Sequence, residues 1–318
     1  MLCVYLALSK KISIADLGAV IVLIGQFLQN FTNFINQING IHGEALSVHS
    51  AMGYFGLLAE KREKTLHSVD TVNFKNVSYA YPEEETSAVK NISITLKKGE
   101  TIAVVGKNGS GKSTLSKLVL GLINPTNGEI KIGNDPMCDV SYETLYKPAT
   151  AVFQDYVHYA MSVKDNISIS NCESPLKADD ACQLLKNLGI TFVDENSNIT
   201  MQTELGVEFG GVDLFGGQWQ QLAIARAAYR EAKIIVLDEP SSALDPLREA
   251  ELYDTFKKLC ENKIGIIITH RLGMCMFADK VLVLDDGEMV EFGTKEELLK
   301  NNGIYARMFQ LQQGLYAE

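Results

Sequence analysis

A glycine-rich stretch at residues 106–114 combines a flexible backbone, a lysine and hydroxyl groups, which together suit phosphate binding. Glycines let the backbone wrap closely around phosphate oxygens, and the N–H groups at the start of a following helix add donors and a positive dipole end. Lys112 supplies a charge for the β- and γ-phosphates, and the Ser113 hydroxyl suits Mg²⁺. The predicted nucleotide-binding residues are Gly106, Asn108, Gly109, Ser110, Gly111, Lys112, Ser113 and Thr114.

Two neighbouring carboxylates, Asp238 and Glu239, follow the apolar run of residues 234–237. The run predicts a buried strand, and the acids mark the point where that strand leaves the sheet. Paired with a phosphate-binding loop, one carboxylate suits the Mg²⁺ shell, and the other suits positioning or activation of a water that attacks the γ-phosphate. We assign the first role to Asp238 and the second, catalytic role to Glu239.

The elements that must position these groups alternate between strands and helices. A predicted strand at residues 102–105 leads into the glycine-rich stretch, and a predicted helix follows at residues 115–120. Residues 69–100 predict a small β-region and residues 155–215 a mostly helical insert. Further elements are predicted as strands at 129–133, 149–153, 234–237, 265–269 and 281–284 and as helices at 176–188 and 218–230. The pattern predicts an α/β fold.

Composition limits the classes of partner. The chain has 318 residues, 46% of them apolar, so it is long enough to bury a core. Its formal net charge of −10 argues against a nucleic-acid partner, because a phosphate backbone is bound by clustered Lys and Arg. The six cysteines are scattered and are interpreted as reduced thiols.

Residues 17–41 contain no charged residue and are long enough to cross a bilayer as a helix. Amide side chains share one face of this predicted helix, at Gln26, Gln29, Asn30, Asn33, Asn36 and Gln37. A soluble amphipathic helix normally has a charged polar face, whereas a spanning helix whose amides face water or partner helices explains a polar, uncharged one. We favour the spanning helix, and we expect the chain to continue helically from Glu44 to His67.

Five further motifs resemble those of ATP-binding cassette (ABC) proteins and follow the family order. They are Tyr81, Gln154, the signature-like Leu214, Phe215, Gly216, Gly217 and Gln218, the D-loop-like Ser241, Ser242, Ala243, Leu244 and Asp245, and His270 between Thr269 and Arg271. The resemblance covers residues 69–313. It implies the P-loop NTPase fold of an ABC cassette, with a RecA-like core, an antiparallel β-subdomain and a helical subdomain.

The resemblance also implies roles. Tyr81 would stack on adenine, His270 would contact the γ-phosphate, and Gln154 would face Mg²⁺ and couple to a membrane domain. The signature residues would contact ATP held by a partner cassette, and the D-loop would pair across the dimer. The implied Mg²⁺ ligands are Ser113, Gln154 and Asp238, and the implied catalytic residues are Glu239, His270 and Gln154.

A helix fused directly to the cassette resembles exporter-type half-transporters. This implies two parts, residues 1–66 as the end of a transmembrane domain with its linker, and residues 69–313 as the cassette. An exporter half of this type has six spanning helices, so we interpret the chain as truncated at its N-terminus. The implied function is ATP hydrolysis that drives export of a peptide, lipid or drug-like substrate. The implied cofactors are ATP and Mg²⁺. The implied partners are a lipid bilayer and a second half-transporter, which is either identical to this chain or different from it. The implied location is the cell membrane, with the cassette on the cytoplasmic side.

The signature-like motif departs from the family at Phe215, where the family has a serine whose hydroxyl donates to the γ-phosphate. Losing one hydrogen bond to a charged group costs about 1.5–3 kcal/mol, which is on the order of tenfold to a hundredfold in rate. Phe215 therefore keeps open an alternative, a nucleotide-binding module with weak ATPase that acts as the regulatory partner in a heterodimer. A soluble cassette ATPase acting on chromosomes or ribosomes is opposed by residues 17–41 and by the acidic charge.

Overall fold

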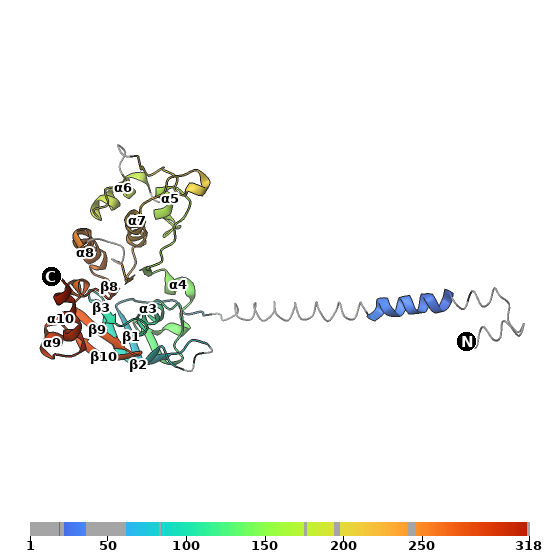
Figure 1. Ribbon diagram of the computed structural model, residues 1–318, viewed down its shortest axis with the longest axis horizontal. Coiled ribbons are helices and arrows are strands. Elements are labelled where there is room, and N and C mark those ends of the chain that lie inside the picture. The colour runs from blue at the N-terminus through green and yellow to red at the C-terminus, as the bar shows by residue number, and fades with distance from the viewer. Residues whose placement is uncertain are drawn as a thin grey trace, which may run out of the picture. The chain divides into compact units, whose positions relative to one another are not determined.

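The computed structural model describes residues 19, 22–35, 62–82, 84, 86–174, 177–193, 198–240 and 246–316. The chain divides into two compact units, residues 1–61 and residues 62–318, and each is considered by itself. Figure 1 labels the helices and several of the strands of the second unit. The predicted division into residues 1–66 and 69–313 remains a prediction.

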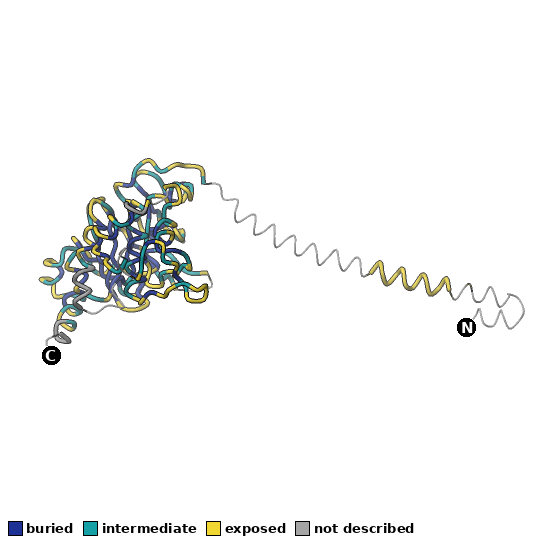
Figure 2. The backbone as a smooth tube through the Cα atoms, turned by 90° about the horizontal axis from the view of Figure 1, so that it is seen from above, coloured by how far each residue is buried: buried dark blue, intermediate teal, exposed yellow. Residues whose placement is uncertain are grey.

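In the first unit, residues 22–35 form a helix on which every residue is exposed (Figure 2). The rings of Phe27 and Phe31 stack with their centroids 6.3 Å apart. Among the residues that the structure describes, no helix is both long and apolar enough to span a membrane. The spanning helix predicted at residues 17–41 extends outside the described residues, and it remains a prediction.

The second unit begins differently from the prediction, because residues 62–67 contain no helix. Lys64 instead pairs with a distant turn: its N–H donates to the Asp139 carbonyl at 3.2 Å, and its carbonyl accepts from the Ser141 N–H at 2.8 Å. The Lys64 ammonium also lies 2.6 Å from the Asp139 carboxylate. The helix expected to run to His67 is therefore wrong at its end, because the backbone groups that it would use internally bind elsewhere.

A four-stranded sheet contains the segments that alternate apolar and polar residues. Its strands are β1 (Thr71–Tyr79), β2 (Val89–Lys97), β4 (Asn127–Ile132) and β5 (Asp135–Pro136). They pair antiparallel in the order β2-β1-β4-β5. Burial alternates along β2, as expected of a sheet with one covered face.

A six-stranded sheet forms the centre of the second unit. Its strands are β3 (Thr101–Gly106), β6 (Ala149–Val152), β7 (Ile234–Asp238), β8 (Ile264–Ile268), β9 (Lys280–Asp285) and β10 (Glu288–Gly293). They lie in the order β10-β9-β3-β8-β7-β6, parallel except for the edge strand β10. Every residue of β7 and β8 is buried, because a parallel sheet is covered on both faces.

The helices complete the unit. They are α3 (Lys112–Val119), α4 (Tyr142–Tyr146), α5 (Val163–Ser168), α6 (Ala178–Asn187), α7 (Gly216–Tyr229), α8 (Pro246–Cys260), α9 (Lys295–Lys300) and α10 (Ile304–Tyr316), with the 3-10 turns η1 (Met137–Asp139), η2 (Val207–Phe209) and η3 (Leu272–Phe277). Figure 1 shows α5, α6 and α7 together at one end of the unit, away from β1 and β2. They share a hydrophobic cluster of their own that includes Leu205 and Trp219.

The predicted class is confirmed: a mainly parallel sheet, an antiparallel sheet and a helical insert all occur. Buried residues concentrate inside the unit of residues 62–318 (Figure 2). The predicted strands at 234–237 and 281–284 lie within β7 and β9. Helix α7 begins two residues before the predicted residue 218, because its first turn includes both glycines of the signature-like motif.

Candidate nucleotide site

The loop between β3 and α3 lies so close to the backbone of neighbouring segments that two of its glycines have no room for a side chain. A Cβ on Gly106 would lie 2.2 Å from the Leu284 carbonyl oxygen, and one on Gly111 would lie 2.3 Å from the Ala88 carbonyl oxygen. Gly111, immediately before α3, also has φ +97°, which L side chains rarely adopt. The glycines thus fix a narrow loop at the start of a helix, where backbone N–H groups favour an anion.

Lys112, the first residue of α3, points back into this loop. Its buried ammonium donates to the Gly106 carbonyl at 2.9 Å and to the Lys107 carbonyl at 2.8 Å. An ammonium has three N–H donors, so these contacts use two. Burial lowers the pKa of Lys112, opposed by the charges of Glu239 and Asp238.

Asp238 ends β7 and is also buried. The Ser113 hydroxyl lies near enough to its carboxylate to influence the carboxyl pKa. Burial, and then the neighbouring Glu239 charge, raise the pKa of Asp238, while the Ser113 hydroxyl and the Lys112 charge act in the opposite direction. A hydroxyl and a carboxylate oxygen that lie near each other in this way are the kind of donor set that Mg²⁺ takes together with phosphate oxygens. The residues present therefore fit a Mg·nucleotide.

Glu239 and His270 contact each other across two neighbouring strands. The Nδ1 atom of His270 lies 3.2 Å from an Oε atom of Glu239. Glu239 has φ +49°, an uncommon conformation for a residue with a side chain, and its N–H donates to the Ile268 carbonyl at 2.9 Å. Such backbone strain is frequent at functional sites. The His270 side chain is half exposed, so it can meet a ligand while touching the glutamate.

The sheet explains why these groups meet. Strand β8 pairs with β3 on one side and with β7 on the other, all parallel. Lys112 follows the loop after β3, Asp238 and Glu239 end and follow β7, and His270 follows β8. The carboxyl ends of parallel strands lie at one edge of a sheet, which is where ligands bind in open α/β folds. The sequence predicted these four residues, and the structure brings them together.

Tyr81 lies beside the same loop. Its hydroxyl is 3.2 Å from the Thr114 hydroxyl, and its ring meets the Tyr79 ring edge-on with centroids 5.0 Å apart. The Lys117 ammonium is 5.8 Å from the Tyr81 ring centroid. The ring thus stands next to α3, and its predicted stacking on adenine remains a prediction.

The signature-like residues lie elsewhere, at the start of α7 in the helical cluster. Leu214 is buried, but the Phe215 side chain is 82% exposed. The Phe215 N–H donates to the Gln218 side-chain oxygen at 3.0 Å, which is half of a capping box; a phenyl ring has no acceptor for the other half. Gly216 and Gly217 form the first turn. The predicted D-loop residues, Ser242, Ala243, Leu244 and Asp245, lie outside the described residues.

The segment after Gln154 is attached to α7. The Tyr156 hydroxyl donates to the Gly216 carbonyl at 3.0 Å, and the His158 ring stacks on the Trp219 ring with centroids 4.2 Å apart. Gln154 itself is exposed. Between described residues, the structure shows no hydrogen bond that joins Gln154 to the Lys112 group, so its predicted role in Mg²⁺ binding remains a prediction.

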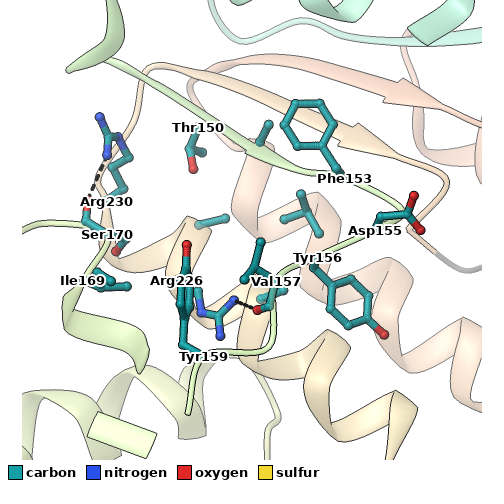
Figure 3. A pocket seen from close by; sticks show the side chains of 14 residues that line it. Thr150, Phe153, Asp155, Tyr156, Val157, Tyr159, Ile169, Ser170, Arg226 and Arg230 are labelled. Carbon is teal, nitrogen blue, oxygen red and sulfur yellow. Dashed lines mark hydrogen bonds between the residues drawn. The ribbon is translucent and has the colours of Figure 1, made fainter. Parts of the chain in front are cut away.

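A pocket of about 280 Å³ lies between this segment and α7 (Figure 3). On its wall, Arg226 donates to the Val157 carbonyl at 2.7 Å, to the Asn166 carbonyl at 3.0 Å and to the Asn166 side-chain oxygen. Burial lowers the pKa of the Arg226 guanidinium. Sequence analysis missed Arg226 and Asn166, because their contacts join segments far apart in the chain.

Comparisons with known proteins agree with this arrangement. The family described as "ABC transporter" matches residues 89–242. The chain thus contains an ABC transporter ATP-binding domain. It is 40% identical over 248 residues to the subtilin transport ATP-binding protein SpaT of Bacillus subtilis, covering 78% of this chain and 40% of that protein. It is 38% identical over 265 residues to the nisin transport ATP-binding protein NisT of Lactococcus lactis subsp. lactis, covering 80% and 44%.

A solved structure of a bacterial Atm1-family ABC exporter with ATP bound matches with a TM-score of 0.72 and 28% identity. The match covers 80% of this chain and 44% of that one. This ABC chain therefore spans less than half the length of the relatives that it matches. The predicted ABC cassette fold is confirmed.

Proposed function

We propose that this ABC chain binds Mg·ATP and hydrolyses it as the ATPase part of an exporter. The observation that carries the proposal is the convergence of Lys112, Asp238, Glu239 and His270 at the ends of three adjacent strands. Relatives named for the transport of subtilin and nisin, and a solved exporter with ATP bound, support the coupling to export. The substrate is proposed only as a peptide, lipid or drug-like molecule.

Each group has a defined task in this proposal. The third N–H donor of Lys112 binds the β- and γ-phosphates. Ser113 and Asp238, with Gln154, hold Mg²⁺, which neutralises charge on the phosphates. Glu239 orients the attacking water and accepts its proton, and His270 keeps the Glu239 carboxylate in place while facing the γ-phosphate. Tyr81 stacks on the adenine.

The proposal needs a second cassette. Within one chain, the signature-like residues open α7, whereas the Lys112 group lies at the ends of β3, β7 and β8, so the signature would be offered to ATP held by a partner. The D-loop residues 242–245 would pair across the same contact. A lipid bilayer and a cell-membrane location, with the cassette on the cytoplasmic side, are part of the proposal. Extraction tests that part: release from membranes by salt without detergent would contradict it.

Hydrolysis is tested with Glu239→Gln in the full chain. We expect the ATPase rate to fall about a hundredfold or more, as on loss of a general base, while binding of a fluorescent ATP analogue persists. Glu261→Gln is the matched control, because Glu261 is exposed on the loop after α8. A wild-type chain without ATPase activity above background, or a Glu239→Gln variant that keeps its rate, would overturn the proposal.

Phe215 favours one alternative, in which the chain is a weakly active partner in a heterodimer. Its exposed ring stands where the family offers a hydroxyl to the partner's ATP. In such a heterodimer, the Lys112 group of this chain would face an intact partner signature and form one competent site. ATPase activity that rises strongly when a second half-transporter is added, and not with concentration of this chain alone, would favour the alternative.

A further inference from the structure

We propose that Gln312, near the end of α10, is a positioning residue that holds the loop carrying His270. The inference rests on the proposed function, because it assigns a role at the same ATPase site. Gln312 touches no reacting group. It acts through the backbone on either side of His270.

The Gln312 amide brackets this loop with two hydrogen bonds. Its Nε2 atom donates to the His270 carbonyl at 2.6 Å. Its Oε1 atom accepts from the Leu272 N–H at 2.9 Å. Leu272 opens η3, and the first N–H groups of a helical turn have no partner inside it. Gln312 therefore supplies, from a distant helix, a cap that the loop does not provide for itself.

The other side of the loop is attached to the sheet. The Thr269 N–H donates to the Val104 carbonyl of β3 at 3.1 Å. The Thr269 hydroxyl accepts from the Arg271 N–H at 2.9 Å. Sheet contacts thus fix the chain before His270, and Gln312 fixes it at and after His270. The imidazole, whose Nδ1 atom lies 3.2 Å from Glu239, is held between these two anchors.

Helix α10 is packed against η3 and can serve as the outer anchor. It packs on η3 through a shared hydrophobic cluster in which Tyr305, Leu272 and Cys275 are all buried. The amide of Gln312 therefore projects from a packed surface. Gln310, two residues earlier on the same helix, is exposed.

The two hydrogen bonds of Gln312 affect the reaction through the orientation of His270. A displacement of about 1 Å at a reacting group can cost on the order of a hundredfold in rate. Without Gln312, the His270 backbone keeps only its sheet anchor, and the Glu239 contact is made for a smaller part of the time. Binding of ATP depends on the β3–α3 loop, which Gln312 does not touch. The loss should therefore appear in kcat and leave KM for ATP unchanged.

The experiment compares Gln312→Met with Gln310→Met in the full chain. Methionine keeps the length and the helix propensity of glutamine but has no amide. We expect Gln312→Met to lower kcat about tenfold or more, with KM for ATP unchanged, and Gln310→Met to leave both constants as in the wild type. Gln312→Glu keeps the acceptor for Leu272 and should retain part of the rate. Equal kcat in all variants, or a change in KM alone, would overturn the inference.

Hydrogen–deuterium exchange gives a readout that does not require activity. Amide exchange in the segment 269–275 should rise roughly tenfold in Gln312→Met, because the Leu272 N–H loses its acceptor, and should stay as in the wild type in Gln310→Met. If the wild type lacks ATPase activity, the proposed function fails while this measurement still decides the contact. Unchanged exchange in Gln312→Met would show that Gln312 does not hold the loop.

Discussion

Asp238 carries a charge that folding makes less favourable. Burial and the Glu239 charge raise its pKa, so the folded protein binds the carboxyl proton more tightly than the unfolded chain does. Burial lowers the pKa of Lys112, so the charged form of this base is also less favourable in the folded protein than in the unfolded chain. At this site a requirement for charged groups opposes stability, which is common where function needs an ion in a buried place.

A pH-dependent stability difference follows for Asp238→Asn. Because the folded pKa is raised, stability falls as pH rises from the ordinary aspartate pKa of about 4 through the raised value, and the penalty persists at neutral pH. Asparagine removes the charge and keeps a side-chain oxygen near the Ser113 hydroxyl. We expect Asp238→Asn to raise the unfolding temperature at pH 7 without added nucleotide, and the difference to shrink below about pH 4.

The control is Asp254→Asn, because Asp254 is an exposed residue of α8. It should leave the unfolding temperature unchanged at both pH values. An Asp238→Asn variant that melts below the wild type at pH 7 would show that attraction to Lys112 outweighs burial.

At the scale of elements, α7 begins without a complete cap. The Gln218 side chain accepts from the Phe215 N–H, but Phe215 offers no oxygen to the first turn of the helix. Its ring is largely exposed, so it contributes little burial in return. Helix α9 shows the complete arrangement: the Thr294 hydroxyl accepts from the Glu297 N–H, and the Glu297 carboxylate accepts from the Thr294 N–H.

Phe215→Ser should therefore stabilise the folded chain. A serine N-cap contributes about 0.5–2 kcal/mol compared with an apolar residue, and we expect a rise in the free energy of unfolding of that order. Phe209→Ser is the matched control, since Phe209 is equally exposed but ends the short turn η2. Equal changes in both variants, measured by thermal unfolding, would mean that surface polarity rather than helix capping is responsible.

At the scale of the whole molecule, the proposed function assigns two half-sites to the cassette. The Lys112 group lies at the edge of the parallel sheet, and the signature opens a helix in a separate cluster. Contacts at Tyr156 and His158 link the segment after Gln154 to that helix. In the proposed function, the two halves would become one site only when another cassette is added, and Phe215 would then stand at the contact.

ATP-dependent association tests this expectation. In a Glu239→Gln background, which should preserve bound ATP, sedimentation with Mg·ATP measures dimer formation. Adding Phe215→Ser should tighten the dimer roughly tenfold or more, because the serine hydroxyl restores a hydrogen bond to a charged phosphate. Adding Phe209→Ser should not. If no homodimer forms in any variant, the heterodimer alternative gains, and if Phe215→Ser weakens association, the argument about the lost serine is wrong.

The loop between β3 and α3 could be predicted from residues that are adjacent in the sequence. Gly106 and Gly111 are needed because backbone atoms would collide with a Cβ there, and Lys112 follows at once in the sequence. The apolar run before Asp238 predicted a buried strand, because parallel strands are covered on both faces. The end of the linker was mispredicted, because the contacts of Lys64 with Asp139 come from residues far along the chain.

The sequence by itself predicted which groups would carry the chemistry, since loop glycines, the Lys112 charge and the strand-end acids follow from adjacent residues. Only the tertiary structure decided that His270 lies 3.2 Å from Glu239, since this requires β7 and β8 to be neighbours in the sheet. Only the tertiary structure showed that Gln312 of α10 contacts the loop that carries His270. A glutamine near the end of a helix gives no indication in the sequence of such a contact. Such contacts depend on packing between residues far apart in the chain, which the short-range periodicity of the sequence does not indicate.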